Sequence, residues 1–466
     1  MDLTSLLDPL APVQVVGEPA VEIADLAYDS RAVRPGTLFF CVPGERVDGH
    51  EFADRAVEDG ASALVVQRPV SASVPQLVVT DVREAMARAA TTFFGRPTEQ
   101  LEVAGVTGTN GKTTTTFLLH SILDAAGRRP GLLGTIESRI GGERRPAVRT
   151  TPEAIDLQRA FREMLDAGDR SAAVEATSHG SEQKRLLGVA FACLVFTNLS
   201  QDHLDFHGTM EAYFDAKRRL FVESLPPAAI NVGDEYGRRL ADELRGLGGE
   251  LMTFGFADDA DLRPGEIDVK TTLRGRFNVE NILGAFAAGR LLGIDDSAIA
   301  AGIESLDGVP GRFEAVDEGQ PFTVLVDYAH TPEALENVLL AARGLDAGRV
   351  LCVFGCGGDR DRGKRPIMGR IAGQFADVAI VTSDNPRSEE PRAIIDEIVA
   401  GADGGLEIEP DRREAIARAI EEARPGDVVV IAGKGHEQGQ QFRDRTVPFD
   451  DREVAREALR RLGAAA

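Results

Sequence analysis

A glycine-rich segment that ends in lysine and threonine is the strongest chemical signal in the sequence. Residues 105–113 read Gly-Val-Thr-Gly-Thr-Asn-Gly-Lys-Thr, between an apolar run and a helical pattern. Backbone N–H groups at such a helix start bind phosphate oxygens, Lys112 can reach the terminal phosphates, and the Thr113 hydroxyl can bind magnesium. Val106 stands where the general pattern has its first glycine, and Gly108 supplies the flexibility instead. The segment predicts a nucleoside triphosphate site, against the alternative of a glycine-rich turn without ligand.

Acidic and imidazole side chains follow two later apolar runs. Glu175 lies at the end of the run 172–176, where P-loop enzymes keep the acid that holds their metal. Taken alone, such an acid is explained equally well as an ordinary residue at a strand end. A second cluster packs four side chains into six residues, namely Asp202, His203, Asp205 and His207. Oxygen-rich ligands with imidazole suit magnesium or manganese better than zinc, which is the alternative.

Lysine is rare in this chain. Of 52 lysines and arginines, six are lysines, at positions 112, 184, 217, 270, 364 and 434. Arginine therefore occupies most positions where any cation suffices. A lysine that remains points to a need for a compact ammonium or for a nucleophilic amine.

These side chains need a scaffold that gathers them at one edge of a sheet. Apolar runs predict buried strands at residues 37–42, 63–66, 101–106, 172–176, 192–197, 229–232, 322–326, 350–354, 378–381 and 428–431. Helical patterns lie at residues 81–94, 113–126, 209–221, 278–292 and 297–306. Strands that alternate with helices predict an α/β fold with parallel sheets, whose ligands bind at the carboxyl ends of the strands.

Two breaks divide the chain into three predicted domains. Gly-Arg-Pro at 95–97 and Gly-Val-Pro-Gly at 308–311 interrupt the pattern, and 466 residues exceed one ordinary core. We predict a small N-terminal α/β domain at 1–97 and a central P-loop-type parallel-sheet ATPase domain at 98–309. A C-terminal Rossmann-like α/β domain is predicted at 310–466.

Composition restricts the setting and the partners. The net charge of −23 argues against a nucleic-acid partner, because phosphate backbones attract basic surfaces. The start has no basic n-region, and no run is long enough to span a bilayer, so we expect no secretion and no membrane insertion. The four cysteines form no disulfide ladder, and Cys352 and Cys356 lack a second pair for a metal site. We expect a cytoplasmic monomer.

Seven motifs, in order along nearly the whole chain, resemble the Mur ligase family. They lie at residues 107–113, 202–210, 213–217, 275–281, 308–312, 327–332 and 433–437. Within that family, the segment 28–36 and Asp-Asn-Pro-Arg at 384–387 are most similar to the enzymes that add diaminopimelate.

The resemblance implies an ATP-dependent ligase of peptidoglycan precursor synthesis. Such an enzyme adds meso-diaminopimelate to UDP-N-acetylmuramoyl-L-alanyl-D-glutamate, with ATP and Mg²⁺. The precursor's carboxylate attacks the γ-phosphorus of ATP to give an acyl phosphate, and the incoming amine displaces phosphate. Because two anions must meet, charge neutralisation and positioning are the main tasks of the protein.

The resemblance also implies roles for individual residues. The ATP contacts are Thr107, Gly108, Thr109, Asn110, Gly111, Lys112, Thr113, Asn281, Arg312, Asp327 and His330. The catalytic residues are Lys112, Glu175, His203 and Lys217, and the magnesium ligands are Thr113, Glu175, His203 and Lys217. Lys217 would serve as a ligand once carbon dioxide has converted it to N6-carboxylysine, which arginine cannot form. The UDP-sugar contacts are Ser30, Thr150, Thr151, Thr177, Gln183 and Arg185, with Glu45, Arg46 and Val47 in a further loop.

A third-residue site is implied for the incoming amino acid. Its members are Arg360, Asp384, Asn385, Pro386, Arg387, Gly433 and Glu437. Diaminopimelate differs from lysine by a distal carboxylate, for which arginine offers a planar bidentate fork. A lysine-adding enzyme has no use for Arg387 in that role. The alternative is that 384–387 is only a strand-ending turn.

Other classes remain to be weighed against this ligase. A folylpolyglutamate synthetase or a cyanophycin-type ligase would not need the N-terminal uridine-type domain. An amidating subunit that works with a glutaminase would be expected to carry a cysteine-rich insertion. A non-catalytic nucleotide-binding module would not need Lys112, His203 and Lys217 together.

Overall fold

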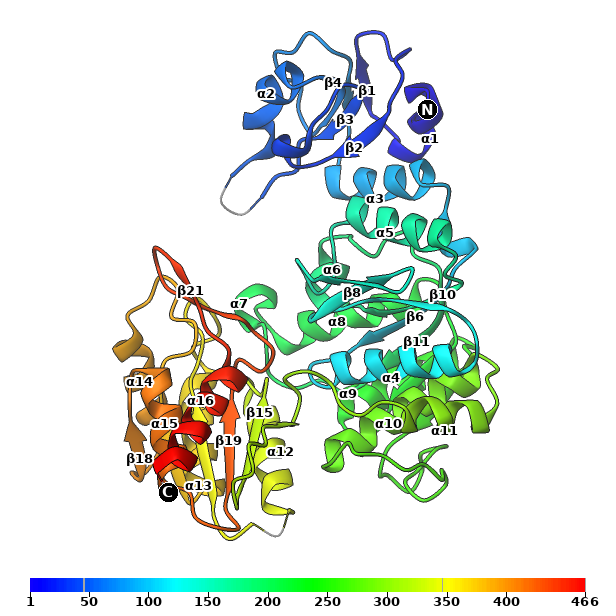
Figure 1. The fold of residues 1–466 in the computed structure, drawn as a ribbon. Helices are drawn as coiled ribbons and strands as arrows, with labels where there is room; N and C mark the ends of the chain where they lie inside the picture. The colour runs from blue at the N-terminus through cyan, green and yellow to red at the C-terminus, as the bar shows by residue number, and fades with distance from the viewer. Residues whose placement is uncertain (45–46, 346, 466) are drawn as a thin grey trace. The chain divides into compact units, whose positions relative to one another are not determined.

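The computed structural model describes residues 1–44, 47–345 and 347–465 (Figure 1). Glu45 and Arg46 of the predicted UDP loop lie outside the described residues. By their internal contacts, residues 1–105, 127–194 and 219–226 form one compact unit. Residues 106–126, 195–218 and 227 onward form the other. The α/β class predicted from the sequence is confirmed, whereas the domain boundaries after residues 97 and 309 remain predictions.

The first sheet has the order β1-β5-β4-β3-β2, with β1 antiparallel at its edge. Its strands are β1 (Gln14–Val16), β2 (Asp25–Ala27), β3 (Thr37–Phe40), β4 (Ala61–Val66) and β5 (Gln76–Val78). The helices of this region are α1 (Leu7–Leu10), α2 (Ala53–Glu58) and α3 (Val82–Phe93). Alternate residues of β3 enter different cores: Leu38 and Phe40 pack with α3, and Phe39 packs with α2. This period of two is what a buried strand requires.

The second sheet has the order β13-β12-β11-β6-β10-β7-β8-β9. Its strands are β6 (Glu102–Thr107), β7 (Pro130–Leu133), β8 (Glu137–Ile140), β9 (Glu143–Pro146), β10 (Ser171–Glu175), β11 (Phe191–Phe196), β12 (Ala228–Asn231) and β13 (Leu251–Phe254). The helices are α4 (Lys112–Ala125), α5 (Ala154–Ala167), α6 (Ser178–Glu182), α7 (Leu204–His207), α8 (Met210–Val222), α9 (Glu235–Gly246), α10 (Arg276–Leu291) and α11 (Asp296–Glu304). Strands β8 and β9 form an antiparallel hairpin that the sequence pattern did not predict.

The third sheet has the order β14-β15-β19-β16-β17-β18, with β14 antiparallel. Its strands are β14 (Glu314–Ala315), β15 (Thr323–Asp327), β16 (Val350–Phe354), β17 (Val378–Val381), β18 (Leu406–Ile408) and β19 (Val428–Ala432), followed by the hairpin β20 (Gly439–Gln441) and β21 (Thr446–Pro448). The helices are α12 (Pro332–Arg343), α13 (Lys364–Phe375), α14 (Pro391–Val399), α15 (Arg412–Glu422) and α16 (Asp451–Ala465).

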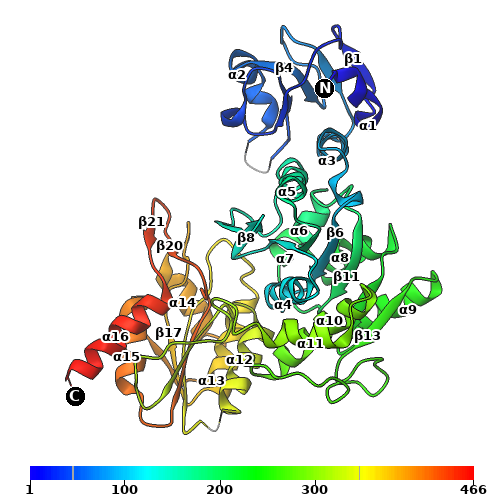
Figure 2. The same cartoon turned by 45° about the vertical axis from the view of Figure 1, so that its right-hand side comes forward.

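Helices cover both faces of this third sheet (Figures 1 and 2). Cys352 and Phe354 of β16 pack with α12, α13 and α14, whereas Leu351 and Val353 pack with α15 and α16. Burial on both faces explains why these strands read as continuous apolar runs. Ligands of such sheets bind at the carboxyl ends of the parallel strands, and for this sheet that remains a prediction.

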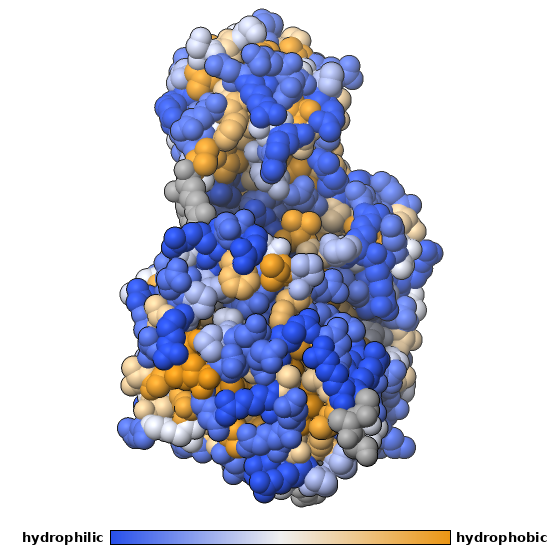
Figure 3. All heavy atoms as spheres, turned by 60° about the vertical axis from the view of Figure 1, so that its left-hand side comes forward, coloured by the Kyte–Doolittle hydropathy of each residue, from blue (hydrophilic) through white to orange (hydrophobic). Residues whose placement is uncertain are grey.

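Hydrophilic side chains cover most of the face shown in Figure 3, and hydrophobic ones form small groups between them. Within the described residues, no helix combines the length and the apolar character needed to cross a membrane.

Candidate functional site

The loop between β6 and α4 has a shape that depends on two glycines. Gly108 has φ +147° and Gly111 has φ +85°, a region that residues with a Cβ rarely adopt. A Cβ at Gly108 would lie 1.8 Å from the Thr197 Oγ1 atom, and one at Gly111 would lie 2.2 Å from the Asn281 Oδ1 atom. The loop therefore has no room for side chains at these two positions, as a phosphate-binding cradle requires.

The loop is held by the residues that follow β11. The backbone N–H of Asn110 donates to Asn198 Oδ1 at 2.9 Å, and that of Thr109 donates to the Asn198 carbonyl at 2.9 Å. The Thr197 hydroxyl donates to the Asn110 carbonyl at 2.6 Å. Thr197 and Asn198 were not predicted as site residues. Their position at the end of a strand that neighbours the loop was the available signal.

Two lysines meet at one carbonyl of the loop. The Nζ atoms of Lys112 and Lys217 donate to the Gly108 oxygen at 2.9 and 2.8 Å. Lys217 is 1% exposed, and its nitrogen lies 4.5 Å from the centre of the Tyr213 ring. Burial, together with the positive charge of Lys112, lowers the pKa of Lys217 well below its ordinary value. A lowered pKa favours the neutral, nucleophilic amine, so the site that the sequence predicted to react with carbon dioxide is suited to it.

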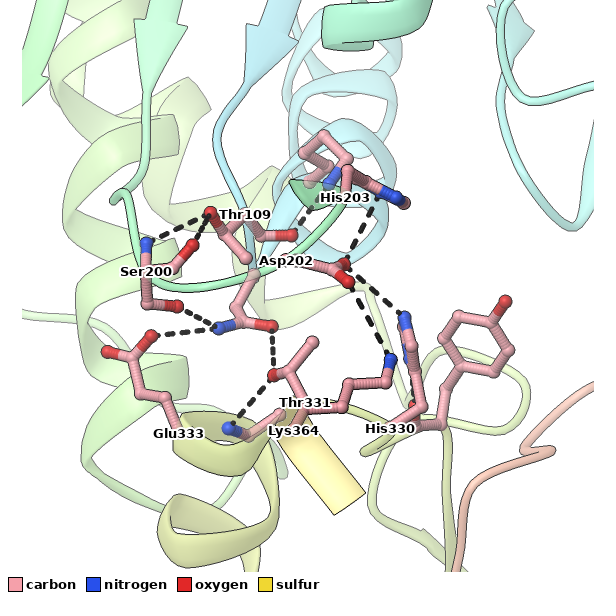
Figure 4. Close-up of polar contacts among 12 residues, drawn as sticks. Thr109, Ser200, Asp202, His203, His330, Thr331, Glu333 and Lys364 are labelled. Carbon is pink, nitrogen blue, oxygen red and sulfur yellow. Dashed lines mark hydrogen bonds and ion pairs between the residues drawn. The ribbon is translucent and has the colours of Figure 1, made fainter. Parts of the chain in front are cut away.

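Asp202 is a buried carboxylate in contact with three cationic or imidazole groups (Figure 4). Its oxygens lie 3.3 Å from His203 Nε2, 3.8 Å from His330 Nε2 and 3.6 Å from Lys364 Nζ. Burial would raise the pKa of Asp202, but the hydrogen bond from His330 and the neighbouring charges lower it well below its ordinary value. His203 has φ +54°, a strained backbone conformation for a residue with a side chain. Asp202 thus connects the predicted metal ligand His203 to the predicted phosphate contact His330.

Thr109 and Asn110 connect the same loop to other segments (Figure 4). The Thr109 hydroxyl contacts the Tyr213 hydroxyl at 3.1 Å and accepts from the Ser200 N–H at 3.0 Å. The Asn110 amide donates to Glu333 at 2.9 Å, at the start of α12. The loop is therefore bonded to α12 as well as to the residues that follow β11.

Arg312 also reaches the loop. Its guanidinium donates to the Thr113 hydroxyl at 2.9 Å and lies 4.4 Å from the centre of the Tyr328 ring. Asp327 accepts the Phe313 N–H at 2.7 Å, and burial raises the pKa of that carboxyl despite the charge of Arg312. The structure thus brings Arg312, predicted to contact ATP, to the helix start where the terminal phosphates are expected.

Glu175 belongs to the first unit and is held by a threonine that was not predicted. Its two oxygens accept the Thr135 N–H at 2.7 Å and the Thr135 hydroxyl at 2.9 Å, and the residue is 1% exposed. A Cβ at Gly134 would lie 2.7 Å from the Glu175 Oε1 atom, so glycine is needed beside the carboxylate. Asp and Glu are rarely this buried unless paired or bound to a metal.

The predicted contacts for the muramoyl peptide gather near Glu175. The Thr151 hydroxyl donates to the Glu175 carbonyl at 2.7 Å, and the Thr177 hydroxyl donates to Thr151 at 2.9 Å. Arg185 donates to the Thr151 carbonyl at 3.0 Å and also bonds to Gln183. Thr150 lies 3.1 Å from Thr135, hydroxyl to hydroxyl. Ser30 lies in a short 3₁₀ turn (Ser30–Ala32) after β2.

The third-residue site lies at the carboxyl ends of β16, β17 and β19. Arg387 has φ +52°, and its guanidinium donates to the Gly358 carbonyl at 2.7 Å. Burial and the positive charge of Arg360 lower the pKa of Arg387. Two guanidinium groups that repel each other would both be stabilised by a bound carboxylate.

The same site also contains the carboxylates of Asp384 and Glu437. Asn385 donates to Glu437 Oε2 at 2.8 Å. Asp384 Oδ2 is buried without a hydrogen-bond partner among the described residues, and a Cβ at Gly433 would lie 2.7 Å from it. Acceptors of this kind, placed near Arg387, fit a ligand that carries both ammonium and carboxylate groups.

The residues predicted for magnesium do not form a cluster of acids and imidazoles. In the described ranges, no three His, Cys, Asp or Glu side chains gather so that they could hold a metal ion. Of the predicted ligands, Thr113, His203 and Lys217 belong to the second unit and Glu175 belongs to the first. Hydroxyl and carboxylate oxygens are ligand types that magnesium prefers, so the chemistry of the predicted ligands fits magnesium if Lys217 carries a carboxyl group.

Three family models match the chain in order. They are the Mur ligase family catalytic domain at residues 22–94, the Mur ligase middle domain at 106–289, and the Mur ligase glutamate ligase domain at 311–435. The fold and the site thus define an ATP-dependent ligase that forms peptide bonds. The chain belongs to the Mur ligase family, so the resemblance seen in the sequence is confirmed.

Individual relatives agree with this assignment. UDP-N-acetylmuramoyl-L-alanyl-D-glutamate--2,6-diaminopimelate ligase of Solibacter usitatus is 48% identical, over 98% of this chain and 96% of that protein. A solved structure described by the same enzyme name is 33% identical, covers 99% of both chains, and has a TM-score of 0.68. The MurF ligase of Thermotoga maritima in complex with ADP is 21% identical, covers 95% of this chain and 98% of its own, and has a TM-score of 0.63, which shows the shared fold.

The loop geometry predicts a specific effect of Gly111→Ala. The new Cβ would face Asn281 Oδ1 at 2.2 Å in a left-handed conformation, so we expect nucleotide binding to weaken about tenfold or more. Calorimetric titration with ADP measures this. Gly246→Ala is the control, because nothing lies within 4 Å of its Cβ position in α9, and its affinity should equal that of the unaltered protein. Unchanged ADP affinity in Gly111→Ala would contradict the assigned role of the loop.

Proposed function

We propose that this chain adds meso-diaminopimelate to UDP-N-acetylmuramoyl-L-alanyl-D-glutamate in the synthesis of peptidoglycan precursors. The observation that carries the proposal is the pair of arginines in the third-residue site. Arg387 is half-buried, and Arg360 lies near enough to lower its pKa. Among candidate amino acids, diaminopimelate supplies the distal carboxylate that would satisfy this charge, and lysine does not.

The proposed reaction has two steps, phosphoryl transfer from ATP and then attack by the amine of the amino acid. A carboxylate oxygen of the precursor attacks the γ-phosphorus of ATP, the bond to the β,γ-bridging oxygen breaks, and ADP leaves. The amine of the amino acid then attacks the carbonyl carbon of the acyl phosphate, loses a proton, and expels phosphate. Lys112 and Arg312, which bond to the loop and to the Thr113 hydroxyl, would neutralise the phosphoryl oxygens during the first step.

We assign the remaining predicted residues to the same reaction. Thr113, Glu175, His203 and carboxylated Lys217 would hold magnesium, which supplies charge neutralisation at the phosphates when bound. Asn281, Asp327 and His330 would contact the nucleotide. Ser30, Thr150, Thr151, Thr177, Gln183 and Arg185 would contact the UDP-sugar peptide. The proposed domains are 1–97 for the UDP-sugar, 98–309 for ATP and 310–466 for the amino acid.

Amino-acid specificity is tested by phosphate release with ATP, magnesium and the UDP-muramoyl dipeptide, with meso-diaminopimelate and L-lysine in parallel. Turnover with diaminopimelate alone is expected. Arg387→Ala should lower kcat/KM for diaminopimelate by about a hundredfold and leave the KM for ATP unchanged, since a charged hydrogen-bond donor is removed.

Arg418→Ala is the matched control, because Arg418 lies exposed on α15 outside the site and its removal should not alter specificity. Turnover with lysine in the unaltered protein would exclude the arginine argument, and turnover with neither amino acid would exclude the proposed function.

Carboxylation of Lys217 is tested separately. The neutral amine attacks carbon dioxide, an N–C bond forms, and the nitrogen loses a proton to give a carbamate. With ¹³C-bicarbonate we expect a carbamate carbon signal in the NMR spectrum that is absent from Lys217→Arg. Short carboxylic acids should partly restore activity to Lys217→Ala, because they can place a carboxylate in the vacated space. The absence of both the signal and the rescue would refute the modification.

A further inference from the structure

Lys434 is a fully buried lysine in the third-residue site, at 0% exposure just beyond the end of β19. Its ammonium donates to Asn385 Oδ1 at 2.9 Å and to Glu437 Oε2 at 3.0 Å. We propose that Lys434 is a positioning residue that fixes Asn385 and Glu437 to receive the ammonium group of the incoming amino acid. This inference rests on the proposed function.

The hydrogen bonds of Asn385 leave its amide in a single orientation. Its oxygen accepts from Lys434 and from the Gln441 N–H at 2.9 Å, and its nitrogen donates to Glu437 at 2.8 Å. If the Asn385 amide were flipped, its NH₂ group would face the Lys434 and Gln441 donors, and its oxygen would face the Glu437 carboxylate. Neither contact could be a hydrogen bond. Since buried polar groups are costly to leave unpaired, Lys434 holds this orientation.

The two oxygens of the Glu437 carboxylate differ in their hydrogen bonds. Oε2 accepts from both Lys434 and Asn385, whereas Oε1 has no hydrogen bond within the described residues. The side chain of Glu437 is 29% exposed, and that of Lys434 is fully enclosed. Oε2 is thus held by Lys434 and Asn385, and Oε1 is available to a ligand ammonium group.

The geometry explains why lysine stands here in a chain rich in arginine. Asn385, Glu437 and Lys434 bond to one another in a closed triangle with sides of 2.8, 2.9 and 3.0 Å. A compact ammonium reaches both Asn385 Oδ1 and Glu437 Oε2 while Asn385 Nδ2 stays bonded to Glu437, whereas a larger planar guanidinium would force the two side chains apart. A buried cation is also costly unless paired, and Glu437 supplies the counter-charge.

The test is Lys434→Met, which has a similar length and cannot donate. We expect the KM for meso-diaminopimelate to rise about 30-fold, because charge-assisted hydrogen bonds are removed. The KM values for ATP and the UDP-muramoyl dipeptide should stay within about twofold, since the hydrogen bonds of Lys434 lie within the third-residue site. Lys270→Met, which removes an exposed lysine outside the site, should match the unaltered protein. A fall in kcat and melting temperature with no change in the KM for diaminopimelate would overturn the inference.

A double-mutant cycle separates positioning from general destabilisation. If Lys434 acts through Glu437, Lys434→Met combined with Glu437→Gln should raise the KM no more than the worse single change does. Effects that multiply would overturn the inference. If Lys434→Met does not fold, Lys434→Gln, which keeps a neutral donor, replaces it in the same cycle. Failure of the unaltered protein to use diaminopimelate defeats the proposed function, whereas an unmoved KM in the variant defeats only the role of Lys434.

Discussion

The acceptance of hydrogen bonds from two lysine Nζ atoms by the Gly108 carbonyl is the interaction on which the phosphate end of the site depends. The charge of Lys112 disfavours a second charge on Lys217. The Gly108 oxygen lies 2.9 Å from the Lys112 nitrogen and 2.8 Å from the Lys217 nitrogen. Its position follows from a loop shape that a residue with a Cβ could not adopt, because Thr197 occupies that space. Burial, together with the positive charge of Lys112, lowers the pKa of Lys217. Gly108 therefore contributes both to the shape of the predicted phosphate-binding loop and to the surroundings that set the pKa of Lys217.

Asp202 balances part of this positive charge. Its carboxylate contacts His203, His330 and Lys364, which come from three different segments. Because its pKa is well below the ordinary value, it stays ionised at neutral pH and holds all three segments together. Lys112 and Arg312 would then provide the positive charge for anionic substrates. This arrangement suits a reaction whose main difficulty is the approach of two anions.

Local patterns explain what the sequence could predict. The loop at 105–113 and the strands at 350–354 and 428–431 were identified because glycine spacing and apolar runs are properties of neighbouring residues. The hairpin at 137–146 was missed because polar side chains fill it and β9 is fully exposed, so no apolar period marks it. The bonds from Thr135 to Glu175 and from Asn198 to Asn110 join residues 40 and 88 positions apart. Such interactions follow from packing, which no local pattern records. The predicted site roles remain to be tested.

The distribution of lysine shows how composition and geometry can support one inference. Lys217, Lys364 and Lys434 are all buried, and their nitrogens contact single oxygen atoms of Gly108, Asp202, and Asn385 with Glu437. Buried arginines in the same chain, Arg365 and Arg412, instead bind carboxylates through two nitrogens. The buried lysines therefore contact single oxygen atoms, even where the partner is a carboxylate, whereas these two buried arginines use the planar fork of the guanidinium. Within the described residues, the half-buried Arg387 donates to the Gly358 carbonyl, which leaves other N–H groups of its guanidinium for the distal carboxylate of the proposed amino acid.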